Sequence, residues 1–243
     1  MRTPRVYTVL ELTIGSSVHL ETAVSRYLLQ SLRQAKGASI ELFNGDGYRY
    51  SATIIESTKS SVTAQIDSKQ TGSNESPLKI HIGLALSRGE RMDYGIRKIV
   101  EMGGNSITPL ITQRCEVRLS KERMEKRIKH WQGIIISACE QCGRNTIPAL
   151  HEPVKLNSWL GAVDDPVRLI FHPSGGTKLA DRPKPKSVAL LVGPEGGFDN
   201  EEVAQAQQQG FDSITLGPRI LRTETAPIAA ISVLQYLWGD FDG

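Results

Sequence analysis

The sequence of 243 residues has no apolar run near the roughly eighteen residues that a membrane-spanning helix needs. Its three cysteines, few and odd in number, argue against a disulfide framework and fit a reducing compartment. The N-terminal residues carry positive charge with no apolar core behind them, which argues against a secretory signal. These absences predict a soluble protein of the cytoplasm with no membrane partner.

Familiar nucleotide-binding and metal motifs are also missing. Neither G-x-G-x-x-G nor G-x-x-x-x-G-K-[ST] occurs, which disfavours an ordinary dinucleotide site and a P-loop. Cys139 and Cys142 have the spacing of a zinc half-site, but completing it would take Cys115 and a histidine at no recognised spacing. The pair also lies at the end of a predicted helix, whereas a reactive thiolate is expected at a helix start. We therefore predict no metal site and no redox site.

Positive charge is concentrated in the middle of the chain. Residues 88–130 contain eleven Lys/Arg and six Asp/Glu, whereas the formal net charge of the whole sequence is only +3. Such a segment could follow the phosphates of a nucleic acid, or it could be the solvated face of helices. Charge alone favours the second interpretation.

Hydrophobic patterning predicts two parts of different architecture. In the first part, strands over 38–43, 48–55 and 61–66 and a helix over 22–34 indicate a small, mostly β module. The turn at 44–47 reads Asn-Gly-Asp-Gly, which accepts the positive φ of hairpin turns. A stretch of linker composition, residues 70–77, marks the boundary.

The second part alternates strands with helices, which predicts a layered α/β domain with a parallel sheet. The strands are expected at 78–86, 107–111, 167–172, 188–192 and 213–216, and the helices at 91–102, 120–142, 201–209 and 225–238.

Two glycine-bearing stretches carry the strongest functional signal. Residues 193–197, the glycine loop, read Gly-Pro-Glu-Gly-Gly, and residues 216–226, the arginine loop, read Leu-Gly-Pro-Arg-Ile-Leu-Arg-Thr-Glu-Thr-Ala. Each follows a predicted strand, and ligands of open α/β sheets bind at the carboxyl ends of the strands. Glycines there let backbone groups approach a flat ligand closely. We predict a compact pocket made largely of main chain.

A purely structural interpretation of the glycine loop stays open. The loop could be a tight connection to the next helix, with Asp199 or Asn200 as the N-cap.

The arginine loop is harder to explain by structure alone. Thr223 or Thr225 could cap the last helix, and Glu224 suits its electropositive start. Capping does not explain Arg219 and Arg222, which suit an anionic group or charge that develops on a substrate oxygen.

Together the two loops resemble the RsmE family of ribosomal RNA uridine N3-methyltransferases, which belongs to the SPOUT superfamily. Residues 87–92, 107–110 and 140–144 also match this family, as do Lys98 and Arg114. At the N-terminus, the pattern of Arg5, Leu32, Arg33 and residues 42–45 looks like the PUA-like RNA-binding domain of the family.

The resemblance implies a PUA-like β-barrel over residues 1–73, a SPOUT α/β domain with a deep trefoil knot over residues 74–243, and a homodimer. It also implies S-adenosylmethionine (SAM) as the methyl donor, held mainly by backbone groups of the knot loops. The residues that the family pattern assigns to this cofactor are His172, Gly193, Pro194, Glu195, Gly196, Gly197, Leu216, Gly217, Ile220, Leu221, Arg222 and Thr223.

The implied activity is methylation of N3 of a uridine in 16S ribosomal RNA, within the small ribosomal subunit. N3 carries a proton, and its loss leaves negative charge on the uracil oxygens that an arginine can stabilise. We assign this role first to Arg222 and second to Arg219. Glu224 is the nearest candidate base, although it could equally serve only the helix dipole. The expected RNA contacts are Arg5, Arg33, Arg91, Lys98, Arg114 and Arg118.

Two other functions stay open. The chain could be a non-catalytic RNA-binding module that keeps the cofactor loops only for folding. Alternatively, residues 193–197 could cradle the phosphate of a nucleotide, although the phosphate-binding lysine of such sites is missing.

Overall fold

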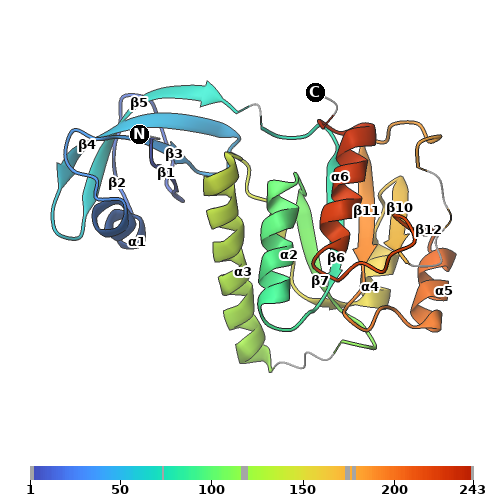
Figure 1. Ribbon diagram of the computed structural model, residues 1–243. Helices are drawn as coiled ribbons and strands as arrows, with labels where there is room; N and C mark the ends of the chain where they lie inside the picture. The colour runs from blue at the N-terminus through green and yellow to red at the C-terminus, as the bar shows by residue number, and fades with distance from the viewer. Residues whose placement is uncertain (1–2, 73, 116–119, 173–175, 177–178, 242–243) are drawn as a thin grey trace. The chain divides into compact units, whose positions relative to one another are not determined.

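The computed structural model describes all residues except 1–2, 73, 116–119, 173–175, 177–178 and 242–243. It divides into two units (Figure 1). The small unit comprises Met1–Glu75 together with Cys139–Ile147, and the large unit comprises Ser76–Ala138 together with Pro148–Gly243.

The small unit is built on one five-stranded sheet in the order β1-β3-β4-β5-β2. All its pairings are antiparallel except that of β1 with β3, which is parallel. Its core contains Val6, Leu28, Leu42 and Ile54, each at most 1% exposed. The strands are β1 (Arg5–Tyr7), β2 (Ser17–His19), β3 (Ser39–Phe43), β4 (Tyr48–Ser57) and β5 (Val62–Thr71), and the helical segment is α1 (Thr22–Arg26) continued by the π-helix η1 (Tyr27–Ser31).

The predicted turn between β3 and β4 is confirmed. Gly45 and Gly47 have φ of 92° and 90°, the left-handed backbone that glycine adopts at no steric cost. The side chain of Asp46 accepts hydrogen bonds from the Tyr48 amide at 3.0 Å and the Tyr50 hydroxyl at 2.6 Å, which fixes the hairpin.

The large unit contains a parallel sheet in the order β12-β10-β11-β6-β7-β8, with β9 also paired to β7. Every pairing in it is parallel, as the alternation of strands and helices predicts. The strands are β6 (Lys79–Ala85), β7 (Ser106–Ile111), β8 (Ala149–Leu150), β9 (Val154–Lys155), β10 (Val167–Phe171), β11 (Ser187–Val192) and β12 (Asp212–Ile214).

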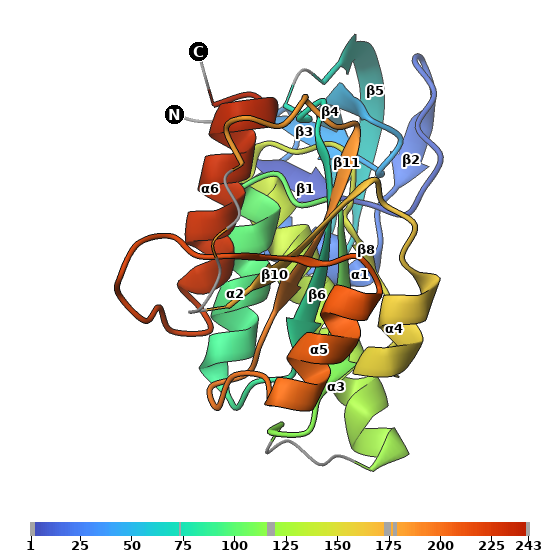
Figure 2. The same ribbon diagram turned by 90° about the vertical axis from the view of Figure 1, so that its right-hand side faces the viewer.

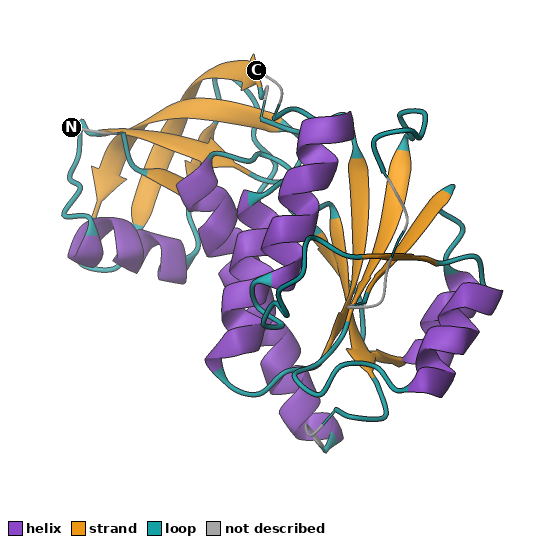
Figure 3. Ribbon diagram, turned by 45° about the vertical axis from the view of Figure 1, so that its right-hand side comes forward, coloured by secondary structure: helices purple, strands orange, loops and turns teal. Residues whose placement is uncertain are grey.

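Helices cover both faces of this sheet. Figures 1 and 2 show α2 and α6 side by side on one face and α4 and α5 on the other, and Figure 3 shows the strands fanning out between them. Residues 82–85 of β6 are all buried, so both faces of this part of the strand are covered. On one face, a Cβ on Gly83 would lie 2.6 Å from the ring of Trp159. The helices are α2 (Glu90–Glu101), α3 (Lys121–Cys142), α4 (Leu156–Ala162), α5 (Asn200–Gln208) and α6 (Ala226–Trp238).

The starts of the last two helices differ in their chemistry. Asp199 caps α5 and forms a capping box with Glu202, so the first of the two predicted caps is confirmed. Thr225 occupies the N-cap position of α6, but no side chain caps this helix, so the expected threonine cap is wrong. The carbonyl of Arg222 instead accepts from the amides of Thr225 and Ala226, both at 2.9 Å.

Five short elements lie outside the ranges predicted from the sequence, namely β1, β2, β8, β9 and α4. Among the described residues, no helix is both long and apolar enough to cross a membrane.

Candidate functional site

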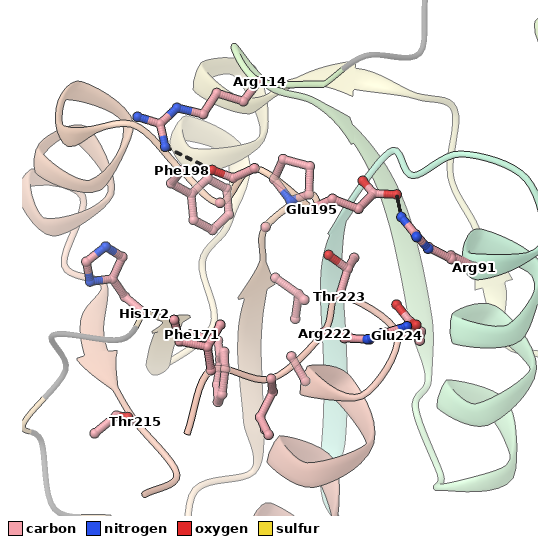
Figure 4. A pocket seen from close by; sticks show the side chains of 18 of the residues that line it. Arg91, Arg114, Phe171, His172, Glu195, Phe198, Thr215, Arg222, Thr223 and Glu224 are labelled. Atoms are coloured by element: carbon pink, nitrogen blue, oxygen red, sulfur yellow. Dashed lines mark hydrogen bonds and ion pairs between the residues drawn. The ribbon is translucent and has the colours of Figure 1, made fainter. Parts of the chain in front are cut away.

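A pocket of about 530 Å³ lies at the carboxyl edge of the parallel sheet in the large unit (Figure 4). Three parallel strands end beside it, β10 at Phe171, β11 at Val192 and β12 at Ile214, so the segments that follow them meet there. The glycine loop and the second half of the arginine loop form most of its wall. Its volume is in the range of small-molecule sites.

Two glycines of the glycine loop pack closely against neighbouring side chains. A Cβ on Gly193 would lie 3.0 Å from the ring of Phe198, and one on Gly196 would lie 3.3 Å from the side chain of Arg114. Gly197 has φ of 65°, and its amide donates to the carbonyl of Pro194 at 2.9 Å. The loop therefore turns tightly and presents backbone to the pocket, as predicted.

Two arginines from other segments hold the glycine loop. Nη1 of Arg91, on α2, bonds Oε1 of Glu195 at 3.0 Å, and Nη1 of Arg114, after β7, donates to the carbonyl of Gly196 at 2.9 Å (Figure 4). Glu195 also accepts from the backbone amide of Arg88 at 3.3 Å. The loop is thus tied to the segments that follow β6 and β7.

These contacts keep the carboxylate of Glu195 charged. Partial burial alone would raise its pKa, but hydrogen bonds from its own backbone amide, Arg91 and the amide of Arg88 outweigh burial, so the pKa lies below its ordinary value. Glu195 therefore acts as an anion at the rim of the pocket at neutral pH.

The arginine loop contributes both polar and apolar groups. Arg219 and Arg222 line the pocket with exposed side chains, whereas Thr223 is only 9% exposed. Ile220 also lines the pocket although its side chain is 87% exposed. In Figure 4, Arg222 and Glu224 lie on the side of the pocket that faces Arg91, across from His172 and Thr215.

Most of the residues predicted for the cofactor and the chemistry lie around this one pocket. Of the predicted set, Leu216 and Gly217 are not among its lining residues, because β12 ends at Ile214 and the chain turns there. Thr215 takes the adjacent position, and its hydroxyl donates to the carbonyl of Gly217 at 3.2 Å. The predicted residues that line the pocket are His172, Gly193, Pro194, Glu195, Gly196, Gly197, Arg219, Ile220, Leu221, Arg222, Thr223 and Glu224.

The sequence interpretation missed several lining residues. Phe171 ends β10 and Phe198 follows the glycine loop. Each is next in the sequence to a predicted residue, and that position is the signal that could have identified it. Arg91 and Arg114, predicted only as RNA contacts, also line the pocket.

Arg5, expected to contact RNA, is engaged inside the small unit. Its side chain is only 9% exposed, and its Nε pairs with Glu41 at 2.8 Å. The guanidinium donates to the carbonyls of Arg144 at 2.7 Å and Cys139 at 3.3 Å, and it lies 4.0 Å over the ring of Phe43. These contacts fasten the end of α3 to β1 and β3, so we do not carry Arg5 into the RNA-binding proposal.

The other expected RNA contacts lie in different surroundings. Arg33 is exposed in the small unit, with a φ of 53° that is unusual for a side chain with a Cβ. Lys98, on α2, pairs with Glu101 at 2.6 Å. Arg118 lies outside the described residues.

Of the three cysteines, Cys139 is the one that is fully buried. Burial raises the pKa of its thiol to about 12, so it is protonated at neutral pH. Within the part of the chain that the structure describes, no group of three His, Cys, Asp or Glu side chains is arranged to hold a metal ion.

Two family models match the chain and follow the two units, except that residues 74–75 and 139–147 of the longer match belong to the small unit. Residues 74–235 match the RNA methyltransferase domain, and residues 20–67 match the RNA methyltransferase PUA domain. Together with the fold and the site, these two matches define the chain as an RNA methyltransferase with a PUA domain.

Curated relatives identify the family within this class. The chain is 39% identical over 98% of both chains to the ribosomal RNA small subunit methyltransferase E of Buchnera aphidicola from Schizaphis graminum. It is 27% identical to the protein of the same name from Bacillus subtilis, over 91% of this chain and 88% of that one. The chain belongs to the ribosomal RNA small subunit methyltransferase E (RsmE) family, as the sequence motifs predict.

Solved structures of similar proteins contain the methyl donor. A methyltransferase from Legionella pneumophila in complex with SAM is 44% identical, with a TM-score of 0.96 over 99% of this chain and 100% of that one. An RsmE protein from Neisseria gonorrhoeae bound to SAM is 40% identical, with a TM-score of 0.93 over the same shares.

Proposed function

We propose that this protein transfers a methyl group from SAM to N3 of a uridine in 16S ribosomal RNA. The observation that carries the proposal is the pocket of about 530 Å³ at the sheet edge, walled by the glycine loop and flanked by Arg219 and Arg222. Similar proteins with SAM bound, at 40% identity or more, support the identity of the donor.

The residues of the pocket fit SAM. The glycine loop offers backbone polar groups in a space that a Cβ on Gly196 would narrow. Leu221 and Phe171 provide apolar surface for an aromatic ring, and Ile220 adds an exposed aliphatic side chain. When bound, SAM supplies an electrophilic methyl group on a positively charged sulfur.

The remaining chemistry falls to side chains at the rim. The N3 proton of uridine must leave so that nitrogen can act as the nucleophile, and the uracil oxygens then carry negative charge. Arg222 is the group that stabilises this charge, with Arg219 as the second candidate. Glu224 is the candidate base, and its position in the lining of the same pocket supports this role.

The substrate RNA would be held by both units. Arg33 of the small unit and Arg91 and Arg114 of the large unit are exposed cations that can bind phosphates. Lys98 and Arg118 remain weaker candidates, Lys98 because it already pairs with Glu101. The target base must leave its stack to reach the pocket, which costs a few kcal/mol.

Three architectural features belong to the same proposal: a PUA-like barrel in the small unit, a trefoil knot and a homodimer. The order of the strands supports the knot. The strand β12 lies at one edge of the sheet, whereas α6, the next helix along the chain, packs beside α2 (Figure 2). The arginine loop must therefore pass the carboxyl ends of β10 and β11 to connect them. The homodimer is supported by two large apolar residues at the surface, Ile220 and Tyr236, which are 87% and 66% exposed. Light scattering can measure the oligomeric state.

Thermal unfolding with added ligand tests the proposal. SAM at one hundred times its dissociation constant should stabilise the fold by about 2.7 kcal/mol, and ATP should not. Methylation of intact small subunits and of naked 16S RNA, followed by mapping of the modified base, then identifies the substrate. SAM binding without any methyl transfer to either would favour a non-catalytic RNA-binding module.

A further inference from the structure

A second cavity adjoins the candidate methyl-donor pocket. It has a volume of about 960 Å³ and lies where the segments after β6 and β7 approach the glycine loop. The two cavities share Arg91, Arg114, Glu195 and Gly196, so a group bound in one lies next to a group bound in the other. We call this second space the arginine cavity.

Three guanidinium groups border the arginine cavity, those of Arg88, Arg91 and Arg114. All three residues are exposed. A guanidinium has five N–H donors. One N–H of Arg91 bonds Glu195, and one N–H of Arg114 donates to the carbonyl of Gly196. This planar donor set matches phosphate oxygens in pairs.

The cavity already binds one anion, which belongs to the protein itself. The carboxylate of Glu195 accepts from Nη1 of Arg91 at 3.0 Å and from the amide of Arg88 at 3.3 Å. Among the described residues that border the cavity, Arg88, Arg91 and Arg114 are basic, and Glu90 and Glu195 are acidic. The position of Glu195 shows that an anionic oxygen can be accommodated between these donors.

We propose that the arginine cavity binds a backbone phosphodiester next to the target base of the substrate RNA. This rests on the proposed function, because a base that enters the donor pocket leaves its own phosphates just outside. The phosphodiester competes with Glu195 for Arg91 and for the amide of Arg88. RNA binding thus releases Glu195 from its ion pair as the base arrives.

The test compares three variants of the full chain with the wild type. Arg88→Ala removes a cation of the cavity, Glu195→Gln removes the internal competitor, and Arg97→Ala is the matched control. Arg97 is exposed on α2, the helix that begins two residues after Arg88, and it borders neither cavity. The measurements are the affinity for a fluorescent 16S RNA transcript as a function of salt, and the dissociation constant of SAM by calorimetry.

The proposal predicts opposite effects for two of the variants. Arg88→Ala weakens RNA binding and lowers the slope of log affinity against log salt by about one, while SAM binding is unchanged. Glu195→Gln strengthens RNA binding, because Arg91 no longer has a charged internal partner. Arg97→Ala leaves the RNA affinity, the salt slope and SAM binding at the wild-type values.

Two results would overturn the proposal. If Arg88→Ala binds RNA as Arg97→Ala does, no phosphate occupies the cavity. If Arg88→Ala weakens SAM binding and leaves RNA binding intact, the arginines hold the carboxylate of the donor instead. If the wild type transfers no methyl group to small subunits or naked 16S RNA while its RNA binding still depends on Arg88, the proposed function is rejected and the phosphate site is retained.

Discussion

Arg222 is the residue on which the proposed chemistry depends most. Its carbonyl fixes the start of α6, while its exposed side chain borders the pocket. Removing a donor that stabilises developing negative charge typically lowers turnover by about 10²–10³-fold. We therefore expect Arg222→Ala to reduce kcat for methylation of small subunits by this order, with little change in the dissociation constant of SAM.

Because the backbone carbonyl of residue 222 remains in this variant, the start of α6 should be preserved, and an unchanged Tm serves as the control. Turnover near the wild-type value would remove Arg222 from the chemistry and direct attention to Arg219.

The cysteines provide a second prediction for single residues. Cys139 is fully buried and its pKa is raised to about 12, whereas Cys115 and Cys142 are partly exposed. At pH 8 in the folded protein, iodoacetamide should modify Cys115 and Cys142 and spare Cys139, as read by mass spectrometry of the peptides. All three should react in denaturant, and early labelling of Cys139 in the native state would contradict its burial.

The residues of the pocket were easier to predict from the sequence than the contacts of the arginines. The glycines and Arg222 were predictable because a few consecutive residues carry the signal, a tight turn for the glycines and a charged loop for Arg222. The role of Arg5 was not, because its partners Cys139 and Arg144 are more than 130 positions away in the sequence. Only the folded chain brings such groups together.

The capping box of α5 ties a helix start to the site. Asp199 accepts from the amide of Glu202 at 2.8 Å, and the carboxylate of Glu202 accepts from the amides of Asp199 at 3.0 Å and Gln113 at 2.7 Å. Loss of an N-cap side chain typically costs about 1 kcal/mol. Asp199→Ala should lower the free energy of unfolding by about this amount in urea titrations.

Asp164→Ala provides the comparison, because it removes an exposed aspartate that caps no helix. Equal stability of the two variants would show that the capping box contributes nothing measurable.

The last turn of α3 carries a carboxyl group with a pH-dependent effect on stability. Burial raises the pKa of Glu140 above its ordinary value of 4.5, against the opposing effects of the Tyr7 amide, which donates to it at 3.0 Å, and the charge of Arg5. The folded protein therefore holds this proton more tightly than the unfolded chain does. The contribution of Glu140 to stability is present below pH 4.5 and decreases as the pH rises above this value.

Glu140→Gln keeps an oxygen that can accept from Tyr7 and removes the titration. The decrease in the free energy of unfolding above pH 4.5 should be smaller in the variant than in the wild type, as measured by denaturant titrations at a series of pH values. Parallel curves for the two proteins would show that Glu140 has the same pKa in both states.

The longer elements were predictable because their periodic patterns are strong. The alternation of Ile80, Ile82 and Leu84 gives β6, and the helical repeat around Trp131 and Ile135 gives α3. The strands β8 and β9 have two residues each, too few to show alternation, and α4 has seven, fewer than two helical turns, so all three depend on packing. Trp159 of α4, for example, is fixed by contact with Gly83 of β6.

For the whole molecule, the parallel sheet is what creates the site. Its strands all end at one edge, so segments that follow β6, β7, β10, β11 and β12 meet there although they lie far apart in the sequence. Sequence order alone predicted that two of these segments would form a pocket. It could not predict that Arg91 and Arg114 would hold the glycine loop, because the strand order β10-β11-β6-β7 is set by the packing of the complete sheet.

A crystal structure of the full chain with SAM would show the donor site itself. We expect the donor between the glycine loop and residues 219–224, with its methyl group directed toward the side of Arg222. Electron density for SAM at any other place, or the two loops separated with the donor absent between them, would contradict this placement.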